Sequence, residues 1–280
     1  MTQPRIMVTG GSGYLGGWVA KLAAADWKVT ATFSSNPGTM PGVDWRRLDV
    51  RDAEAVAALI GSLNPQVIVH TAALNPGQGN DFEAVNVTGT VNVANAAAAA
   101  GAHLIHISTD MVFDGQKGNY AEADTPAPLN EYGRTKALAE QAVATSGAVT
   151  AIVRTSLIYG WRPTVARAAQ WMIDAVDAGQ QIRLWSDEMR CPIWVESLAA
   201  AIVELADLGH TGPVHIAGDQ AISRYDFGLA LLRFHGVDTS QVVGIPSPSD
   251  QLRPLNCTLD SSLARAMLET PLPGVTKVLG

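Results

Sequence analysis

Short apolar runs alternate with helix-like segments through the first 160 residues of this chain. The first run, residues 5–9, leads through a glycine cluster into a helix-like segment. Further apolar runs at 28–33, 44–48, 66–70, 103–107 and 149–154 alternate with helical stretches at 52–63, 81–100 and 131–146. Strands joined by helices need right-handed crossovers and a parallel sheet covered on both faces. The sequence therefore predicts an α/β fold with a doubly wound parallel sheet.

Beyond residue 160 the elements become shorter and are separated by glycines and prolines. We therefore expect a larger domain over 1–160 and a smaller C-terminal region over 161–280. Of the 280 residues, 47% are apolar and 16% are charged, which is typical of a globular chain and excludes disorder.

Charge and hydropathy exclude two classes of partner. With 19 basic and 26 acidic residues the formal charge is −7, and no basic block occurs, so we expect no binding to nucleic acid. No apolar stretch is long enough to span a bilayer, and residues 1–9 lack the features of an export signal. We expect a cytoplasmic protein that does not enter the membrane.

The glycine cluster is the first chemical signal. Gly10, Gly13 and Gly16 follow the first strand and lead into the first helix, with Tyr14 and Leu15 inside the same turn. Glycines let the backbone approach a pyrophosphate, and a helix N-terminus offers unpaired N–H groups and partial positive charge. The sequence therefore predicts a Rossmann dinucleotide-binding domain.

The residues after the second and third strands bear on the choice of dinucleotide. A ribose-binding carboxylate is expected at the end of the second strand, but Ser34 and Ser35 stand there instead. Hydroxyls tolerate the extra phosphate of NADP better than a carboxylate does, although no arginine stands in that stretch. We expect NADP, with NAD possible. Asp49 and Val50, after the third strand, are candidates for contact with the adenine ring, and Asp49 could instead cap a helix.

Tyr132 and Lys136 are the second chemical signal. Residues at i and i+4 share one face of a helix. A phenol has a pKa of about 10, and a neighbouring ammonium favours its ionised form, which makes the pair a usable acid or base near neutral pH. Ser108 and Thr109 end the fifth strand, where ligands collect in open α/β sheets. Either hydroxyl could hydrogen-bond the oxygen of a substrate carbonyl.

Taken together, these motifs resemble the extended short-chain dehydrogenase/reductase superfamily. The segments 108–115, 154–156 and 253–260 resemble its dTDP-4-dehydrorhamnose reductase branch. The resemblance implies that Thr109, Tyr132 and Lys136 form a catalytic triad. It also implies that Asn86 helps to order the active site and that Ala72 and Ala73 line the cofactor.

Substrate-binding residues are predicted on the same basis. That branch usually has Tyr where Met111 stands and Trp where Leu157 stands, so both positions are expected to contact the substrate. The candidates for binding a diphosphate group are Arg162, Arg190 and Arg253, because a guanidinium can donate two parallel hydrogen bonds to phosphate oxygens. We predict no metal site, because the histidines form no ligand pattern.

The sequence as a whole indicates an NAD(P)H-dependent reductase that transfers hydride to a ketone, a 4-keto sugar nucleotide or a related small molecule. Tyr132 would donate the proton. One alternative is a regulatory subunit without catalysis, like the β subunit of methionine adenosyltransferase, and another is an NAD-dependent sugar epimerase. The apolar face at 137–143 permits a homodimer, although packing within one chain explains it equally well.

Overall fold

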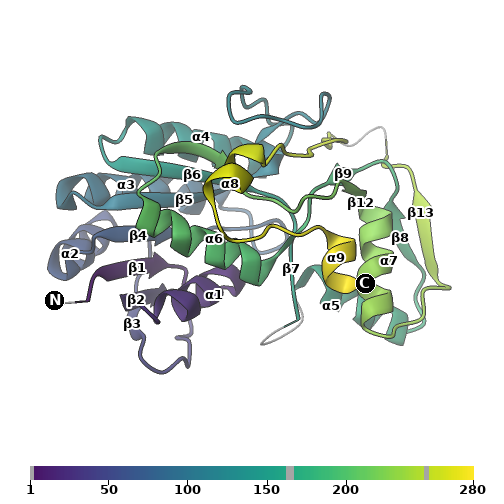
Figure 1. Cartoon of the computed structure of the whole chain (residues 1–280), viewed down its shortest axis with the longest axis horizontal. Coiled ribbons are helices and arrows are strands. Elements are labelled where there is room, and N and C mark those ends of the chain that lie inside the picture. The colour runs from purple at the N-terminus through teal and green to yellow at the C-terminus, as the bar shows by residue number, and fades with distance from the viewer. Residues whose placement is uncertain (1–2, 162–166, 249–251) are drawn as a thin grey trace. The chain divides into compact units, whose positions relative to one another are not determined.

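The computed structural model describes residues 3–161, 167–248 and 252–280 (Figure 1). The chain divides into two compact units. Unit 1 comprises Met1–Thr109, Glu131–Val153 and Ala199–Val214, and unit 2 comprises Asp110–Asn130, Arg154–Leu198 and His215–Gly280. The single boundary that we expect near residue 160 stays a prediction.

Among the described residues, seven strands form one sheet in the order β11-β6-β5-β4-β1-β2-β3. β1 pairs in parallel with β2 and β4, β2 with β3, and β4 with β5. The order β3-β2-β1-β4-β5-β6 is that of a Rossmann sheet, so the predicted fold class is confirmed. The strands are β1 (Arg5–Thr9), β2 (Lys28–Phe33), β3 (Asp44–Arg47), β4 (Val67–His70), β5 (His103–Thr109), β6 (Val149–Thr155) and β11 (Gly212–His215).

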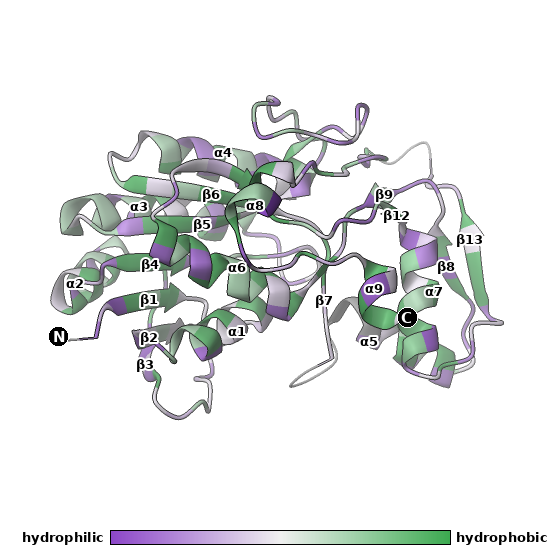
Figure 2. Cartoon of the chain, in the orientation of Figure 1, coloured by the Kyte–Doolittle hydropathy of each residue, from purple (hydrophilic) through white to green (hydrophobic). Residues whose placement is uncertain are grey.

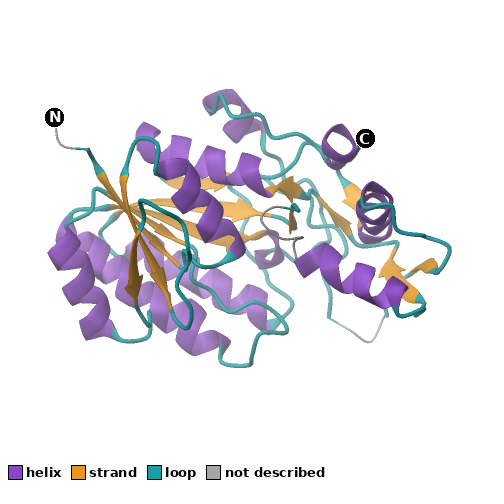
Figure 3. Cartoon of the chain, turned by 90° about the horizontal axis from the view of Figure 1, so that it is seen from below, coloured by secondary structure: helices purple, strands orange, loops and turns teal. Residues whose placement is uncertain are grey.

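Helices cover both faces of these strands (Figure 3). They are α1 (Tyr14–Ala23), α2 (Ala53–Leu63), α3 (Gly89–Ala100), α4 (Glu131–Thr145) and α6 (Val195–Leu208). Hydrophobic residues run along the strands (Figure 2). Met7, Ile68 and Leu104 of β1, β4 and β5 pack against α2 and α3 in one buried cluster. Such double-sided burial is what a parallel sheet requires.

The beginnings of two helices bear on the predicted site residues. The side chain of Asp52 caps α2 by accepting a hydrogen bond from the Ala55 N–H at 3.0 Å. The helix expected over 81–100 is instead a π-helical segment, Glu83–Thr88, followed directly by α3. A π-helical turn is wider than an α-helical one and often lies at a functional site. Here it contains Asn86.

Unit 2 consists of short paired strands and helices around its own buried cluster. β8 pairs in parallel with β13, β7 with β10, and β9 is antiparallel to β12. Tyr159, Phe227 and Leu232 belong to the buried cluster. The elements are a short 3₁₀ turn (Asp110–Val112), β7 (Ile158–Tyr159), α5 (Arg167–Asp177), β8 (Ile182–Trp185), β9 (Met189–Arg190), β10 (Ile193–Trp194), β12 (Ile222–Ser223), α7 (Arg224–Phe234), β13 (Val242–Ile245), α8 (Ser262–Met267) and α9 (Val275–Leu279).

The length and hydropathy of a helix decide whether it could cross a bilayer. Across the described ranges, the structure contains no helix with the length and apolar character needed to cross a bilayer.

Candidate active site

The glycine turn connects β1 to α1 in unit 1. Gly10 has a φ of +66°, which favours glycine, and its carbonyl accepts a hydrogen bond from the Gly13 N–H at 2.8 Å. A Cβ at Gly10 would lie 2.8 Å from the Cα of Ala72, and one at Gly16 would lie 2.4 Å from the Gly10 carbonyl oxygen. The turn therefore needs its glycines to pack against the end of β4.

The N-terminus of α1 suits a dinucleotide pyrophosphate. Its N-cap, Gly13, has no side chain to accept from the helical N–H groups, and the first turn, which includes Tyr14, Leu15 and Gly16, carries no acidic residue. The N–H groups of a first helical turn and the positive end of the helix dipole favour an anion placed there. The donor set of this turn therefore fits the group that the fold implies.

The end of β2 brings together residues that are distant in sequence. Ser34 and Ser35 are exposed, and the carbonyl of Ser34 accepts a hydrogen bond from the Arg47 Nε at 3.3 Å. Arg47 is the last residue of β3 and is a residue that the sequence analysis missed. The available signal was its position at the end of a strand expected to lie beside β2.

Asp49 and Val50 follow β3 closely. Asp49 is paired with Arg51 at 2.6 Å, and its hydrogen bond with Arg51 lowers the pKa of this exposed carboxyl. Val50 is buried in the cluster that includes α2 and α3. Since Asp52 caps α2, Asp49 is not the cap of that helix.

Lys136 is buried on α4, one turn after Tyr132. Its side chain is nearly inaccessible, and Nζ donates to the Ile107 carbonyl at 2.6 Å and lies 3.3 Å from His106 Nε2. Burial lowers the pKa of this ammonium from 10.5 to about 8, and the charge of Glu140 opposes the shift. A lysine buried in this way and shifted in pKa is a candidate for a functional group, since perturbed pKa values cluster at functional sites.

The hydroxyl of Tyr132 donates to the Asn75 Oδ1 at 3.3 Å, and its ring meets the ring of Phe82 edge-on with centroids 6.1 Å apart. Tyr132 is half-buried, unlike Lys136. The phenol and the ammonium thus rise from one face of α4 with the lysine deeper in the fold. Asn75 is a second residue that the sequence analysis missed.

β5 meets α4 through side chains on one face of the strand. His106 contacts Lys136, and two residues on, Ser108 Oγ donates to the Glu140 Oε1 at 2.5 Å. Residues two apart on a strand and four apart on a helix each share a face, so this pattern was visible in the sequence. Ser108 is engaged with buried Glu140, while Thr109 ends the strand on its other face.

Two buried histidines lie next to Lys136: His106 contacts it directly, and His70 packs against His106. The rings of His70 and His106 lie 5.5 Å apart, and His70 bonds Thr9 Oγ1 at 2.7 Å and Thr90 Oγ1 at 3.0 Å. Burial, aided by the charge of Lys136, lowers the pKa of His70 to about 3 and that of His106 well below its usual value. Both rings are neutral at physiological pH.

Asn86 connects the loop after β4 to α4. It is fully buried, accepts from the Leu74 N–H at 2.7 Å and donates to the Leu74 carbonyl at 3.0 Å and to Thr135 Oγ1 at 3.4 Å. Thr135 in turn donates to the Tyr132 carbonyl at 3.0 Å. The amide therefore holds the loop containing Ala72 and Ala73 against the turn that carries the phenol.

The predicted substrate residues belong to unit 2. Arg190 is almost completely buried, donates to the carbonyls of Met189, Leu255 and Pro254, and points Nη2 at Met111 Sδ, 3.7 Å away. It is also ion-paired with Asp110 and Glu188 at 3.7 and 3.6 Å.

Arg253 shares buried Glu188 with Arg190 but keeps a third of its side chain exposed and lies over the ring of Trp185. Leu157 packs against the buried cluster of unit 2. Glu188 is the residue that the sequence analysis missed here, and nothing in its local sequence marks it. Arg162 lies outside the described residues.

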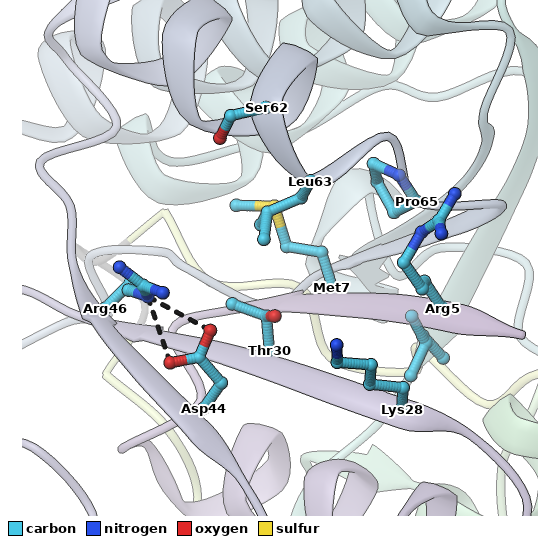
Figure 4. A pocket seen from close by; sticks show the side chains of 10 residues that line it. Arg5, Met7, Lys28, Thr30, Asp44, Arg46, Ser62, Leu63 and Pro65 are labelled. Carbon is cyan, nitrogen blue, oxygen red and sulfur yellow. Dashed lines mark hydrogen bonds and ion pairs between the residues drawn. The ribbon is translucent and has the colours of Figure 1, made fainter. Parts of the chain in front are cut away.

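A cavity of about 300 Å³ opens at the amino ends of β1, β2 and β3 (Figure 4). Arg5, Lys28 and Asp44, each the first residue of its strand, line it. The glycine turn follows the opposite end of β1. This cavity is therefore separate from the site described above.

Comparison with known proteins identifies the family. Residues 4–279 match the model of the RmlD substrate binding domain. The chain is 31% identical to the probable low-salt glycan biosynthesis reductase Agl14 of Haloferax volcanii, over 84% of this chain and 81% of that protein. It is 32% identical to methionine adenosyltransferase 2 subunit beta of Pongo abelii, over 92% and 80% of the two chains.

Among solved structures, a dTDP-4-dehydrorhamnose reductase from Bacillus anthracis in complex with NADP superimposes with a TM-score of 0.85 and 25% identity, covering 99% of this chain and 98% of that one. These matches confirm the resemblance predicted from the motifs. The chain belongs to the RmlD substrate binding domain family, within the extended short-chain dehydrogenase/reductase superfamily.

Proposed function

We propose that this chain is an NAD(P)H-dependent reductase that converts the ketone of a 4-keto sugar nucleotide, or of a related carbonyl compound, into an alcohol. The observation that carries the proposal is the buried ammonium of Lys136, fixed by the Ile107 carbonyl one helical turn from the Tyr132 phenol. The relatives of this chain include a dTDP-4-dehydrorhamnose reductase whose structure was solved in complex with NADP. A bound reduced nicotinamide dinucleotide supplies the hydride in this chemistry.

The residues of unit 1 perform the proton chemistry. Tyr132 donates its phenolic proton to the substrate oxygen, and the Lys136 ammonium stabilises the phenolate left behind. We assign Thr109 to hydrogen-bond the same substrate oxygen, because it is the last residue of β5, at the edge of the sheet where ligands bind in this fold. Asn86 keeps the phenol-bearing turn in place.

The cofactor residues follow the Rossmann scheme. We assign the pyrophosphate to the turn of Gly10, Gly13 and Gly16 with Tyr14 and Leu15, and the adenine side to Asp49 and Val50. Ala72, which packs against Gly10, and Ala73 would line the bound cofactor next to the turn. We assign Lys136 also to the nicotinamide ribose, which it would bind with the cofactor in place.

Recognition of the substrate is assigned to unit 2. Arg253, whose side chain is one-third exposed, suits an anionic group such as a diphosphate. The N–H groups of Arg190 are directed at carbonyls and carboxylates of the same unit, so its part is to hold Arg253 and Met111 in position. Leu157 supplies an apolar contact.

Replacing the phenol tests the proposal. NADPH oxidation is followed with dTDP-4-dehydrorhamnose, other 4-keto sugar nucleotides and small ketones as substrates. Tyr132→Phe should reduce turnover by about 100-fold or more and leave NADPH affinity nearly unchanged, because only the proton donor is lost. Tyr225→Phe, a half-buried tyrosine of α7, is the control and should retain activity. Full turnover by Tyr132→Phe would exclude this mechanism.

The relative named as a methionine adenosyltransferase subunit supports one competing function. A regulatory subunit would bind NADPH and a partner enzyme and would oxidise no NADPH with any substrate of the panel. Turnover of any ketone by the wild type, abolished in Tyr132→Phe, decides for the reductase.

We further propose that the protein is cytoplasmic, and we leave the homodimer that the sequence permits to be decided by experiment. Ala137, Ala139 and Val143 of α4 are already buried within one chain, so they do not argue for pairing. Light scattering of the purified protein measures the oligomeric state directly.

A further inference from the structure

The end of β2 is where dinucleotide folds choose between NAD and NADP. A carboxylate there accepts hydrogen bonds from the adenosine ribose of NAD, whereas a nearby arginine accommodates the 2′-phosphate of NADP. In this chain residues 34–43 contain no Asp or Glu. No carboxylate of that segment therefore repels a phosphate.

Arg47 supplies the cation that the segment itself lacks. The parallel register sets Arg47 of β3 directly beside Phe33, the last residue of β2. Its Nε donates to the Ser34 carbonyl at 3.3 Å, and its side chain is exposed. Within the described ranges no carboxylate forms an ion pair with Arg47, so its charge is not neutralised locally.

The neighbouring arginine is arranged differently. Arg46 forms an ion pair with Asp44 at 3.0 Å, and both line the cavity at the amino ends of the strands (Figure 4). Consecutive strand residues point to opposite faces of a sheet. Arg46 and Arg47 therefore form a natural matched pair, one neutralised and one available.

The loop that follows β2 is folded back on β3. The indole of Trp45 lies so close to Gly38 that a Cβ there would come within 2.1 Å of it, and Trp45 Nε1 donates to the Met40 carbonyl at 3.5 Å. These contacts hold the loop that follows Ser34 and Ser35 against β3, the strand that carries Arg47.

We propose that Arg47 binds the 2′-phosphate of NADPH, assisted by the hydroxyls of Ser34 and Ser35, and that it makes this chain prefer NADPH to NADH. A guanidinium binds phosphate oxygens through two parallel N–H groups, which an ammonium cannot do. The inference rests on the proposed function and specifies its cofactor.

Equilibrium binding tests this assignment without any substrate. The fluorescence of the reduced nicotinamide gives the dissociation constants of NADPH and NADH at low ionic strength. Arg47→Ala should weaken NADPH binding about 10- to 100-fold, the range expected for hydrogen bonds to a charged group, and change NADH binding by less than about threefold. Because Arg47 is exposed, thermal melting should show an intact fold.

Three comparisons make the test specific. Arg46→Ala should leave both constants within about threefold, and Arg47→Lys should lie between the wild type and Arg47→Ala. Added salt should reduce the NADPH preference of the wild type, since the contact is exposed. If the wild type binds both dinucleotides and Arg47→Ala leaves their ratio unchanged, the inference is wrong and the reductase proposal stands. A wild type that binds neither dinucleotide overturns both.

Discussion

The buried ammonium of Lys136 should leave a signature in the pH dependence of folding. Its pKa falls from 10.5 to about 8 on folding, a difference that corresponds to about 3 kcal/mol. Between these two values the unfolded chain binds a proton that the folded chain has released. The free energy of unfolding should therefore rise with pH in this window, by about 1.4 kcal/mol per pH unit from this group. Below pH 8 both states are protonated and the full cost of burial is present.

Urea unfolding followed by far-UV circular dichroism between pH 7 and pH 10.5 measures this effect. The difference in free energy of unfolding between the wild type and Lys136→Met should increase by about 3 kcal/mol across the window. The thiols of Cys191 and Cys257, whose pKa values are raised by burial, act in the opposite direction but equally in both proteins.

The control is Lys28→Met, which removes an exposed lysine of β2 and should give a flat difference curve. A flat curve for Lys136→Met as well would refute the reasoning. In that case the interior around Lys136 would accept the ammonium at no cost.

Two further pairs of variants test packing and charge. A Cβ at Gly16 would meet a backbone carbonyl oxygen at 2.4 Å, so Gly16→Ala should lose about 1–3 kcal/mol in urea unfolding. At Gly17 the nearest atom is 3.4 Å away, and Gly17→Ala should gain up to about 1 kcal/mol; equal changes would contradict the packing argument. Glu188→Gln leaves the buried Arg190 short of a partner and should lose about 3–5 kcal/mol, whereas Glu83→Gln in an exposed pair should change stability by less than about 1 kcal/mol. Similar losses in both glutamine variants would count against a buried ion cluster.

The features that could be predicted from the sequence are local in the chain. The glycine turn is recognisable from three glycines between a strand and a helix, and Tyr132 and Lys136 from their spacing of one helical turn. The alternation of strands and helices gave the parallel sheet correctly. In each case the physical constraint acts between residues close in sequence.

The features that could not be predicted depend on which strands are neighbours and which side chains are buried. Arg47 reaches Ser34 only because β2 and β3 pair in a parallel register that no local pattern specifies. Arg190 and Arg253 look alike in the sequence, yet the Arg190 side chain is enclosed by carbonyls and a third of the Arg253 side chain is exposed. Glu188 joins them from a position without any local signal.

The π-helical segment Glu83–Thr88 sets the directions in which the side chains before and after it point around the helix axis. Each residue of an α-helix advances the chain by about 100° around the axis, so one residue more or less redirects every side chain on the far side of the change. Deleting Val87 would turn the amide of Asn86 away from both Leu74 and Thr135. The loss of a single codon would then uncouple the loop beside the glycine turn from the helix that carries the phenol, although no proposed catalytic residue had been replaced.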